Sequence, residues 1–286
     1  MSQQIFVVTG ANKGIGYGIV ETLASTVNNA IIYLTARDES RGKSAVQKLE
    51  QELGNKKKSE IRFHQLDIED EASAKRFAEY LKKTHGEIDV LINNAGFAFK
   101  QDATESAEEQ ANVTIGINYY GTKKVSTQLV PLIKKGGRIV NVCSQAGVMI
   151  DMSKDKEMEK FKIMKDIYDE KHIQKLKNAS SEKEIDEFVE EYKKAAKDDT
   201  RKEHGFPCSA YRVSKAAEIA YTLLLHRQHK DLVVNACCPG YVNTDMSSGK
   251  GPLTIEQGAD TPVYLATDSN APNGDFVYQR KSIPWC

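Results

Sequence analysis

Short apolar runs alternate with amphipathic segments along most of the chain, and this alternation limits the folds open to it. The runs are rich in β-branched residues and apolar at consecutive positions, as in parallel strands covered by helices on both faces. Segments 40–53, 71–83 and 214–229 have helical spacing. The alternation predicts an α/β fold, a Rossmann-type doubly wound parallel sheet with helices on both faces. The predicted strands are 5–8, 30–34, 61–66, 90–92, 139–142, 232–236 and 276–278.

Length, charge and cysteine content exclude several classes of protein. The 286 residues suit one large domain, over 1–286. Lys plus Arg and Asp plus Glu are both 40, whereas nucleic-acid-binding proteins usually carry an excess of basic residues. No apolar stretch approaches the ~20 residues of a membrane span, and the N-terminus lacks the basic region of a signal peptide. Five cysteines without a CxxC pair fit neither a disulfide framework nor a zinc site. We therefore expect a cytoplasmic protein with no metal, no nucleic acid and no membrane association.

One segment, 151–205, breaks the alternation. It has 30 charged residues among 55, against 50 among the other 231. Apolar residues still recur at helical spacing, which predicts surface helices that pack on the body through narrow apolar stripes. We interpret the segment as a helical insertion within the domain and not as a separate functional module. The two stripes are Phe161, Met164, Ile167 and Tyr168, and then Ile185, Phe188, Val189 and Tyr192.

A glycine-rich turn follows the first predicted strand. Gly10, Gly14 and Gly16 stand between that strand and an apolar-periodic helix. Glycines at such a turn let the backbone approach a pyrophosphate, and the helix N-terminus offers free N–H groups to the phosphates. A surface turn without a ligand is the alternative. The position between a strand and a helix favours a dinucleotide site.

The end of the second predicted strand bears on the choice of dinucleotide. An acidic residue here usually binds the ribose 2′-hydroxyl of NAD, whereas an arginine suits the 2′-phosphate of NADP. Arg37 occupies this position, and Lys13 in the glycine-rich turn adds a second cation. The pair favours NADP(H), although Asp38 would reverse the preference if the register moved by one residue.

A serine, a tyrosine and a lysine indicate acid–base chemistry. Ser144 follows the fifth predicted strand, at the sheet edge where such folds bind ligands. Tyr211 and Lys215 are four residues apart and share one face of a helix. An adjacent ammonium group favours the phenolate form and so brings a tyrosine toward useful acid–base strength. The alternative is an exposed aromatic–lysine pair without a catalytic role. The serine and the dinucleotide turn in the same chain argue against this alternative.

The order of these motifs resembles the short-chain dehydrogenase/reductase family over nearly the whole chain. Finer matches resemble its cytosolic NADPH-dependent carbonyl reductases, a branch that also has a long insertion before the catalytic tyrosine. Cys143, where serine is common, and Tyr241, where tryptophan is common, depart from the pattern. The family motifs are Thr9-Gly10-x3-Gly14-x-Gly16, Asn93-Asn94-Ala95-Gly96, Ser144, Tyr211-x3-Lys215 and Pro239-Gly240. The finer matches are 12–16, 34–38, 63–68, 98–100, 235–240 and 261–266.

The resemblance implies a role for each matched residue. Tyr211 would donate a proton to the substrate oxygen, Ser144 would polarise the carbonyl, and Lys215 would bind the nicotinamide ribose and lower the tyrosine pKa. Asn118 would anchor a water in a proton relay. The implied substrate contacts are Ser144, Tyr211, Phe99 and Tyr241. The implied cofactor contacts are Gly10, Asn12, Lys13, Gly14, Ile15, Gly16, Arg37, Asp67, Ile68, Asn93, Ala95, Gly96, Tyr211, Lys215, Pro239, Gly240, Val242 and Thr244.

The sequence thus predicts an NADPH-dependent reductase of ketone, aldehyde or quinone carbonyls. Two alternatives remain: a hydroxysteroid or prostaglandin dehydrogenase on the same fold, and a catalytically silent NADP(H)-sensing protein. Simpler family members usually dimerise through the helix that follows the Asn118 region and the helix that carries Tyr211 and Lys215. Because the insertion enters just before the second of these helices, we expect its apolar stripes to cover that face and to leave a monomer.

Overall fold

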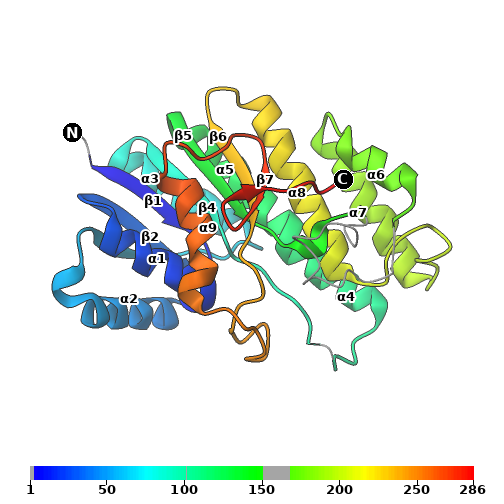
Figure 1. The fold of residues 1–286 in the computed structure, drawn as a ribbon, viewed down its shortest axis with the longest axis horizontal. Helices are drawn as coiled ribbons and strands as arrows, with labels where there is room; N and C mark the ends of the chain where they lie inside the picture. The colour runs from blue at the N-terminus through cyan, green and yellow to red at the C-terminus, as the bar shows by residue number, and fades with distance from the viewer. Residues whose placement is uncertain (1–2, 101, 151–167) are drawn as a thin grey trace.

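The computed structural model describes residues 3–100, 102–150 and 168–286 of the chain, which form one eight-stranded sheet with helices on both faces (Figure 1). The strands are β1 (Gln4–Val8), β2 (Ala30–Ala36), β3 (Glu60–Gln65), β4 (Ile88–Asn93), β5 (Ile133–Val142), β6 (Val233–Cys238), β7 (Phe276–Tyr278) and β8 (Lys281–Ser282). The helices are α1 (Gly14–Thr26), α2 (Glu39–Leu53), α3 (Glu71–His85), α4 (Ala107–Ile115), α5 (Thr122–Leu129), α6 (Glu170–Lys177), α7 (Glu182–Lys197), α8 (Ala210–Gln228) and α9 (Ile255–Thr267).

The strand order confirms the predicted doubly wound sheet. It is β3-β2-β1-β4-β5-β6-β7-β8, with every neighbouring pair parallel except β7 and β8. Strands β1, β2 and β3 follow one another toward one edge of the sheet, and the chain then returns to place β4 on the other side of β1. Strand β4 pairs with β1 from Val90 opposite Phe6 onward. Open sheets of this kind bind ligands at the carboxyl ends of the strands at such a reversal.

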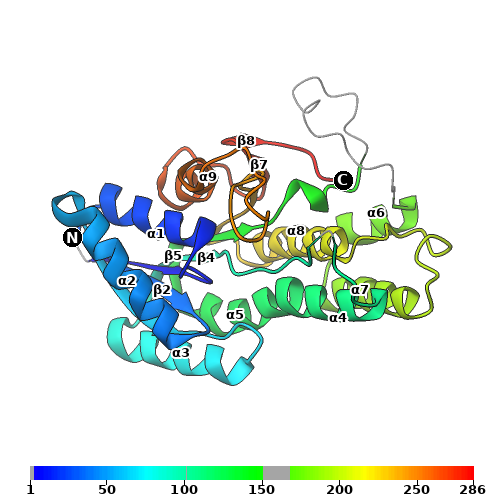
Figure 2. The same ribbon diagram turned by 90° about the horizontal axis from the view of Figure 1, so that it is seen from below.

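Two apolar cores flank the sheet. Helices α1, α2 and α9 enclose one core, in which Ile19, Leu49 and Val263 are buried. Helices α3, α5 and α8 enclose the other, together with the apolar face of α7. Figure 2 shows α1 and α9 on one side of the strands and α3 and α5 on the other. Because both faces are covered, the central strands are apolar at consecutive positions: every residue of β2 is buried.

A π turn, Gly116–Gly121, joins α4 to α5 and carries Asn118 in its middle. A π turn inserts one extra residue into a helix, and such turns occur often at functional sites. Asn118 is fully buried here, and its side chain points to neighbouring loops and helices rather than to solvent. The irregular turn was not predicted from the sequence.

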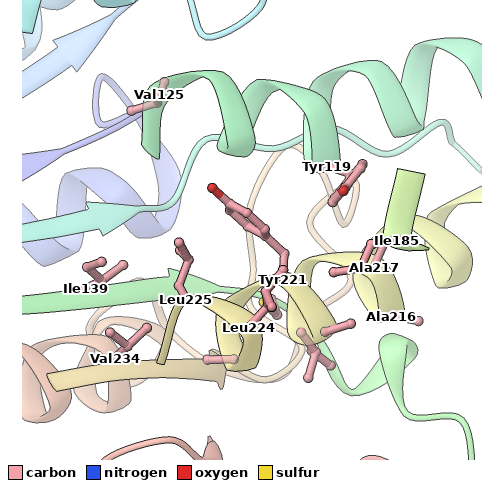
Figure 3. Close-up of a cluster of buried hydrophobic side chains, with 14 of the residues drawn as sticks. Tyr119, Val125, Ile139, Ile185, Ala216, Ala217, Tyr221, Leu224, Leu225 and Val234 are labelled. Carbon is pink, nitrogen blue, oxygen red and sulfur yellow. The ribbon is translucent and has the colours of Figure 1, made fainter. Parts of the chain in front are cut away.

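The described part of the insertion packs on the body through α7. All four residues of the second predicted stripe, Ile185, Phe188, Val189 and Tyr192, are fully buried. They lie against α4 and α8, and Figure 3 shows Ile185 in one cluster with Tyr119 and Ala217. Of the first stripe, Tyr168 is buried, whereas Phe161, Met164 and Ile167 lie outside the described residues.

Polar contacts also join α7 to the π turn and to the first turn of α5. Asp186 accepts hydrogen bonds from the Tyr119 hydroxyl (2.8 Å) and from Lys123 Nζ (2.7 Å). Lys123 also pairs with Glu182 at 3.0 Å. The insertion therefore contacts the segment that carries Asn118 through charged as well as apolar groups.

Candidate active site

A cleft of about 1470 Å³ opens at the carboxyl ends of the strands. Typical small-molecule sites measure ~300–1,000 Å³, so this cleft has room for a dinucleotide and a second ligand. Helix α8 forms one wall, and the glycine-rich turn forms another. Of the predicted contacts, it is lined by Gly10, Asn12, Lys13, Gly14, Ile15, Arg37, Asp67, Ile68, Ala95, Gly96, Phe99, Tyr211, Lys215, Pro239 and Thr244.

The glycine-rich turn lies tightly against the end of β4. Gly10 has a φ of +61°, and a Cβ there would lie 2.7 Å from the Cα of Ala95. The Thr9 hydroxyl accepts hydrogen bonds from the backbone N–H groups of Asn94 and Ala95, at 3.0 Å each. A larger residue than glycine would therefore push the turn away from β4.

The N-terminus of α1 is open to an anion. The helix begins at Gly14, its N-cap residue Lys13 makes no side-chain capping bond, and its first turn has no acidic residue. Free N–H groups and the positive end of the helix dipole therefore face the cleft. These features match the needs of a pyrophosphate.

Two arginines line the cleft beyond the end of β2. Arg37 is largely exposed and lies 3.6 Å from Glu69, and Arg41 joins it from the first turn of α2. Asp38, which could have reversed the cofactor preference, also lines the cleft, and it caps α2 by accepting the Arg41 N–H at 2.8 Å. Sequence reasoning missed Arg41, although it stands four residues after Arg37, at the start of the predicted helix 40–53.

A salt bridge crosses the rim of the cleft. Lys13 Nζ lies 2.8 Å from Asp245, which belongs to the loop between β6 and α9, and both side chains are mostly exposed. The predicted cofactor contact Lys13 therefore already has a partner. Asp245 was not predicted, and no motif in the sequence pointed to it.

Tyr211 and Ser144 meet at the inner end of the cleft. Tyr211 lies in the first turn of α8, which Ser209 caps, and its hydroxyl is hydrogen-bonded to that of Ser144. Ser144 follows β5 and begins a short 3-10 turn. Burial raises the pKa of Tyr211, while the charge of Lys215 and the bond to Ser144 lower it. The pair can hold an oxygen atom and pass it a proton.

Lys215 is buried one turn along α8 and has two partners there. Its Nζ lies 2.7 Å from the carboxylate of Glu218 and donates to the Val142 carbonyl at 3.3 Å. It also lies 5.7 Å from the centre of the Tyr211 ring. Sequence reasoning missed Glu218, although it shares the helix face of Tyr211 and Lys215 and is a charged residue in an apolar stretch.

Asn118 joins three segments around the site. Its Oδ1 accepts the backbone N–H of Phe97 (2.7 Å), and its Nδ2 donates to the Phe97 carbonyl (2.9 Å) and to the Ser214 hydroxyl (2.9 Å). These bonds hold the loop after β4 against α8. Phe97 in turn makes an edge-to-face contact with Phe99, at 4.9 Å between ring centres, and both rings line the cleft.

Comparison with known proteins places this site in a family. The model of the short chain dehydrogenase family matches residues 4–153. Carbonyl reductase (NADPH) 3 of Mus musculus is 36% identical over 99% of this chain and 98% of its own length. The chain belongs to the short-chain dehydrogenase/reductase family. Carbonyl reductase (NADPH) 1 of Homo sapiens is 39% identical over 98% of both chains. The resemblance seen in the motifs is thus confirmed.

Solved structures of other short-chain dehydrogenase/reductases have the same architecture. Salutaridine reductase from Papaver somniferum superposes with a TM-score of 0.81 and 32% identity, covering 96% of this chain and 99% of that one. Menthone neomenthol reductase from Mentha piperita gives a TM-score of 0.74 and 29% identity, covering 96% and 98%.

Several residues that the family pattern assigns to ligand binding do not line the cleft. The Asn93 side chain is buried and donates to Ser126 and Asn141. Val242 is buried, and Tyr241 is 47% exposed. Ser144 is hydrogen-bonded to Tyr211, which lines the cleft. Gly16 and Gly240, which are also predicted cofactor contacts, are absent from the cleft lining, as is Asn118, the predicted anchor of a water.

Within 3–100, 102–150 and 168–286, no group of three or more His, Cys, Asp or Glu residues could hold a metal ion. None of the helices in these ranges is long and apolar enough to cross a membrane.

Proposed function

We propose that this short-chain dehydrogenase/reductase reduces ketone, aldehyde or quinone carbonyls to alcohols with NADPH. The observation that carries the proposal is the placement of Tyr211, bonded to Ser144 and next to Lys215, at the inner end of a cleft whose other end holds Arg37. The names of the curated relatives, which are NADPH-dependent carbonyl reductases, support it.

The residues of the cleft fit NADPH. The open N-terminus of α1 suits the pyrophosphate, and Gly10 lets the preceding turn pack against Ala95 at the end of β4. Arg37 and Arg41 suit the 2′-phosphate, because guanidinium groups bind phosphate oxygens in pairs of hydrogen bonds. Lys215 lies near Gly96, on the side where the nicotinamide ribose would bind.

When bound, NADPH supplies a hydride from its nicotinamide ring. Ser144 donates a hydrogen bond to the carbonyl oxygen and holds it beside Tyr211. Tyr211 then passes its phenolic proton to that oxygen, and the positive charge of Lys215 stabilises the phenolate that remains. Asn118 holds the loop and the helix that meet there, and we assign it the anchoring of a water that returns a proton to the site.

NADPH oxidation, followed by absorbance, tests the proposal against a panel of quinones, α-dicarbonyls, aromatic aldehydes and ketosteroids. Turnover of at least one class, with the alcohol as product, is the expected result. A preference for steroid or prostaglandin alcohols as substrates for oxidation would favour the dedicated dehydrogenase. Tight binding of NADPH without turnover of any carbonyl or alcohol would favour the silent sensor and contradict the proposal.

We also propose that the protein is a monomer in the cytosol. Helix α7 lies on α4, which precedes Asn118, and on α8, which carries Tyr211, and its apolar face is fully buried there. Lys123, at the start of the helix after Asn118, also bonds to Asp186 of α7. An intramolecular cover avoids the entropy cost of association with a second subunit. All five cysteines are free thiols, which supports a reducing compartment.

A further inference from the structure

A buried carboxylate lies beside the lysine of the site and has no part in the mechanism above. Glu218 is 1% exposed and Lys215 is 4% exposed, and their charged groups are 2.7 Å apart. Glu218 lies three residues after Lys215 and seven after Tyr211, so that the three share one face of α8. A buried charge is costly unless it is paired, so a glutamate at this position needs an explanation.

We propose that Glu218 is a positioning residue that holds the ammonium group of Lys215 and offsets its charge, so that Tyr211 keeps its proton until the substrate takes it. The inference rests on the proposed function, because it assigns Tyr211 as the proton donor. A donor must be protonated when the substrate binds. An isolated lysine at this distance would draw the tyrosine toward its phenolate form.

The groups that face Glu218 come from three elements. Lys215 and Tyr211 lie on α8, the hydroxyl of Thr122 on α5 lies 3.5 Å from Oε1, and the thiol of Cys143 follows β5. Burial raises the pKa of Cys143 well above its usual value, so that this thiol stays neutral. The remaining fixed charge in this group is that of Lys215, which Glu218 therefore balances.

The electrostatics of the site agree with this role. Burial raises the pKa of Glu218 to about 7, so its carboxylate is charged through the alkaline range in which a tyrosine titrates. Burial raises the pKa of Tyr211, the charge of Lys215 lowers it, and the negative charge of Glu218 raises it. Removing the negative charge while keeping the lysine should make Tyr211 lose its proton more readily.

Glu218→Gln tests the proposal because it removes the charge and keeps the shape. In the pH profile of kcat/KM for carbonyl reduction, the alkaline limb is the fall in kcat/KM at high pH. We expect this limb to move to lower pH by about one unit. Glu218→Asp, which restores a carboxylate, should return the limb toward its wild-type position. Glu190→Gln is the matched control, because it removes a carboxylate on α7 that bonds to Tyr120, and it should leave the limb in place. An unmoved limb in Glu218→Gln, or a move to higher pH, would overturn the proposal.

A second measurement does not depend on turnover. The ring carbons of ¹³C-labelled tyrosines report ionisation by NMR, and the resonance that Tyr211→Phe removes belongs to Tyr211. We expect its titration midpoint to fall in Glu218→Gln, whatever the substrate of the protein is. If no carbonyl is reduced but the midpoint falls, the proposed function fails and the role of Glu218 stands. Should the glutamine variant not fold, Glu218→Met offers an uncharged side chain of similar length, and an unchanged midpoint in it would refute the proposal.

Discussion

The amide of Asn118 donates to the hydroxyl of Ser214 at 2.9 Å, and that hydroxyl donates in turn to the backbone carbonyl of Tyr211, also at 2.9 Å. The π turn is thus connected to the first turn of α8 by two consecutive hydrogen bonds. Because Asn118 also holds both backbone groups of Phe97, one buried amide fixes the loop after β4 relative to the tyrosine.

Ser214→Ala should destabilise the protein by about 1–3 kcal/mol, because it leaves a buried amide hydrogen without an acceptor. Urea unfolding measures the change. Thr127→Ala serves as the control, since it removes an exposed hydroxyl that bonds within α5, and it should have a much smaller effect. Equal stability of Ser214→Ala and the wild type would show that the amide finds another acceptor.

Tyr211→Phe should lower turnover by at least about 10²-fold, the usual scale of general acid catalysis. The ring remains, so NADPH binding, measured by fluorescence titration, should change little. Turnover close to that of the wild type would contradict the role assigned to the hydroxyl.

Arg37→Ala should weaken NADPH binding roughly ten- to a hundredfold, because a charge-assisted bond to phosphate is worth about 1.5–3 kcal/mol. NADH lacks the 2′-phosphate, so its affinity should scarcely change. Arg62→Ala removes an arginine that pairs with Glu60 and does not line the cleft, and it controls for loss of a positive charge. An equal loss for both cofactors in Arg37→Ala would make Arg37 a structural residue.

The stability of the wild type relative to Glu218→Gln should fall as the pH rises from about 4.5 to about 7. Burial raises the pKa of Glu218 from 4.5 to about 7, so over this window the folded state binds more protons than the unfolded state. Stability then decreases with rising pH. Urea unfolding of both proteins across the window measures the difference, and parallel curves would show that Glu218 is not titrating there.

The wild type should have the mass of one chain, 31.9 kDa, in size exclusion with light scattering at micromolar concentration. Val189→Asp places a charge in the fully buried face of α7 and should loosen the cover over α4 and α8. Dimers or aggregates are then expected, whereas Glu187→Lys on the exposed side should stay monomeric. A stable dimer or tetramer of the wild type would refute the proposal.

Most of the fold was predictable because its signals are local. All seven predicted strands are present, and the errors lie at their ends: β5 begins six residues before the predicted start, at Ile133, and β6 ends two residues later, at Cys238. The antiparallel β8 was missed, since two exposed residues carry no apolar pattern. Helix α8 begins at Ala210 because Ser209 caps it, whereas the apolar periodicity alone predicted that the helix starts at Ser214.

The site residues that belong to a sequence motif were predictable. Those whose placement depends only on tertiary contacts were not. The spacing of Tyr211 and Lys215 was sufficient to predict their shared face. Nothing near Asp245 in the sequence indicates its bridge to Lys13, which joins residues 232 positions apart. The inward placement of Asn93 likewise depends on Asn141 and Ser126, partners that come from a neighbouring strand and helix.

The π turn takes up one more residue than a regular helix would over the same rotation. Its backbone hydrogen bonds span five residues instead of four, so the extra residue is accommodated locally. A regular helix over the same six residues would instead turn the whole of α5 by about 100°. Thr122 would then leave Glu218, and Lys123 would leave Asp186. The contacts of α5 with the insertion and with the lysine–glutamate pair therefore both depend on the π form of 116–121.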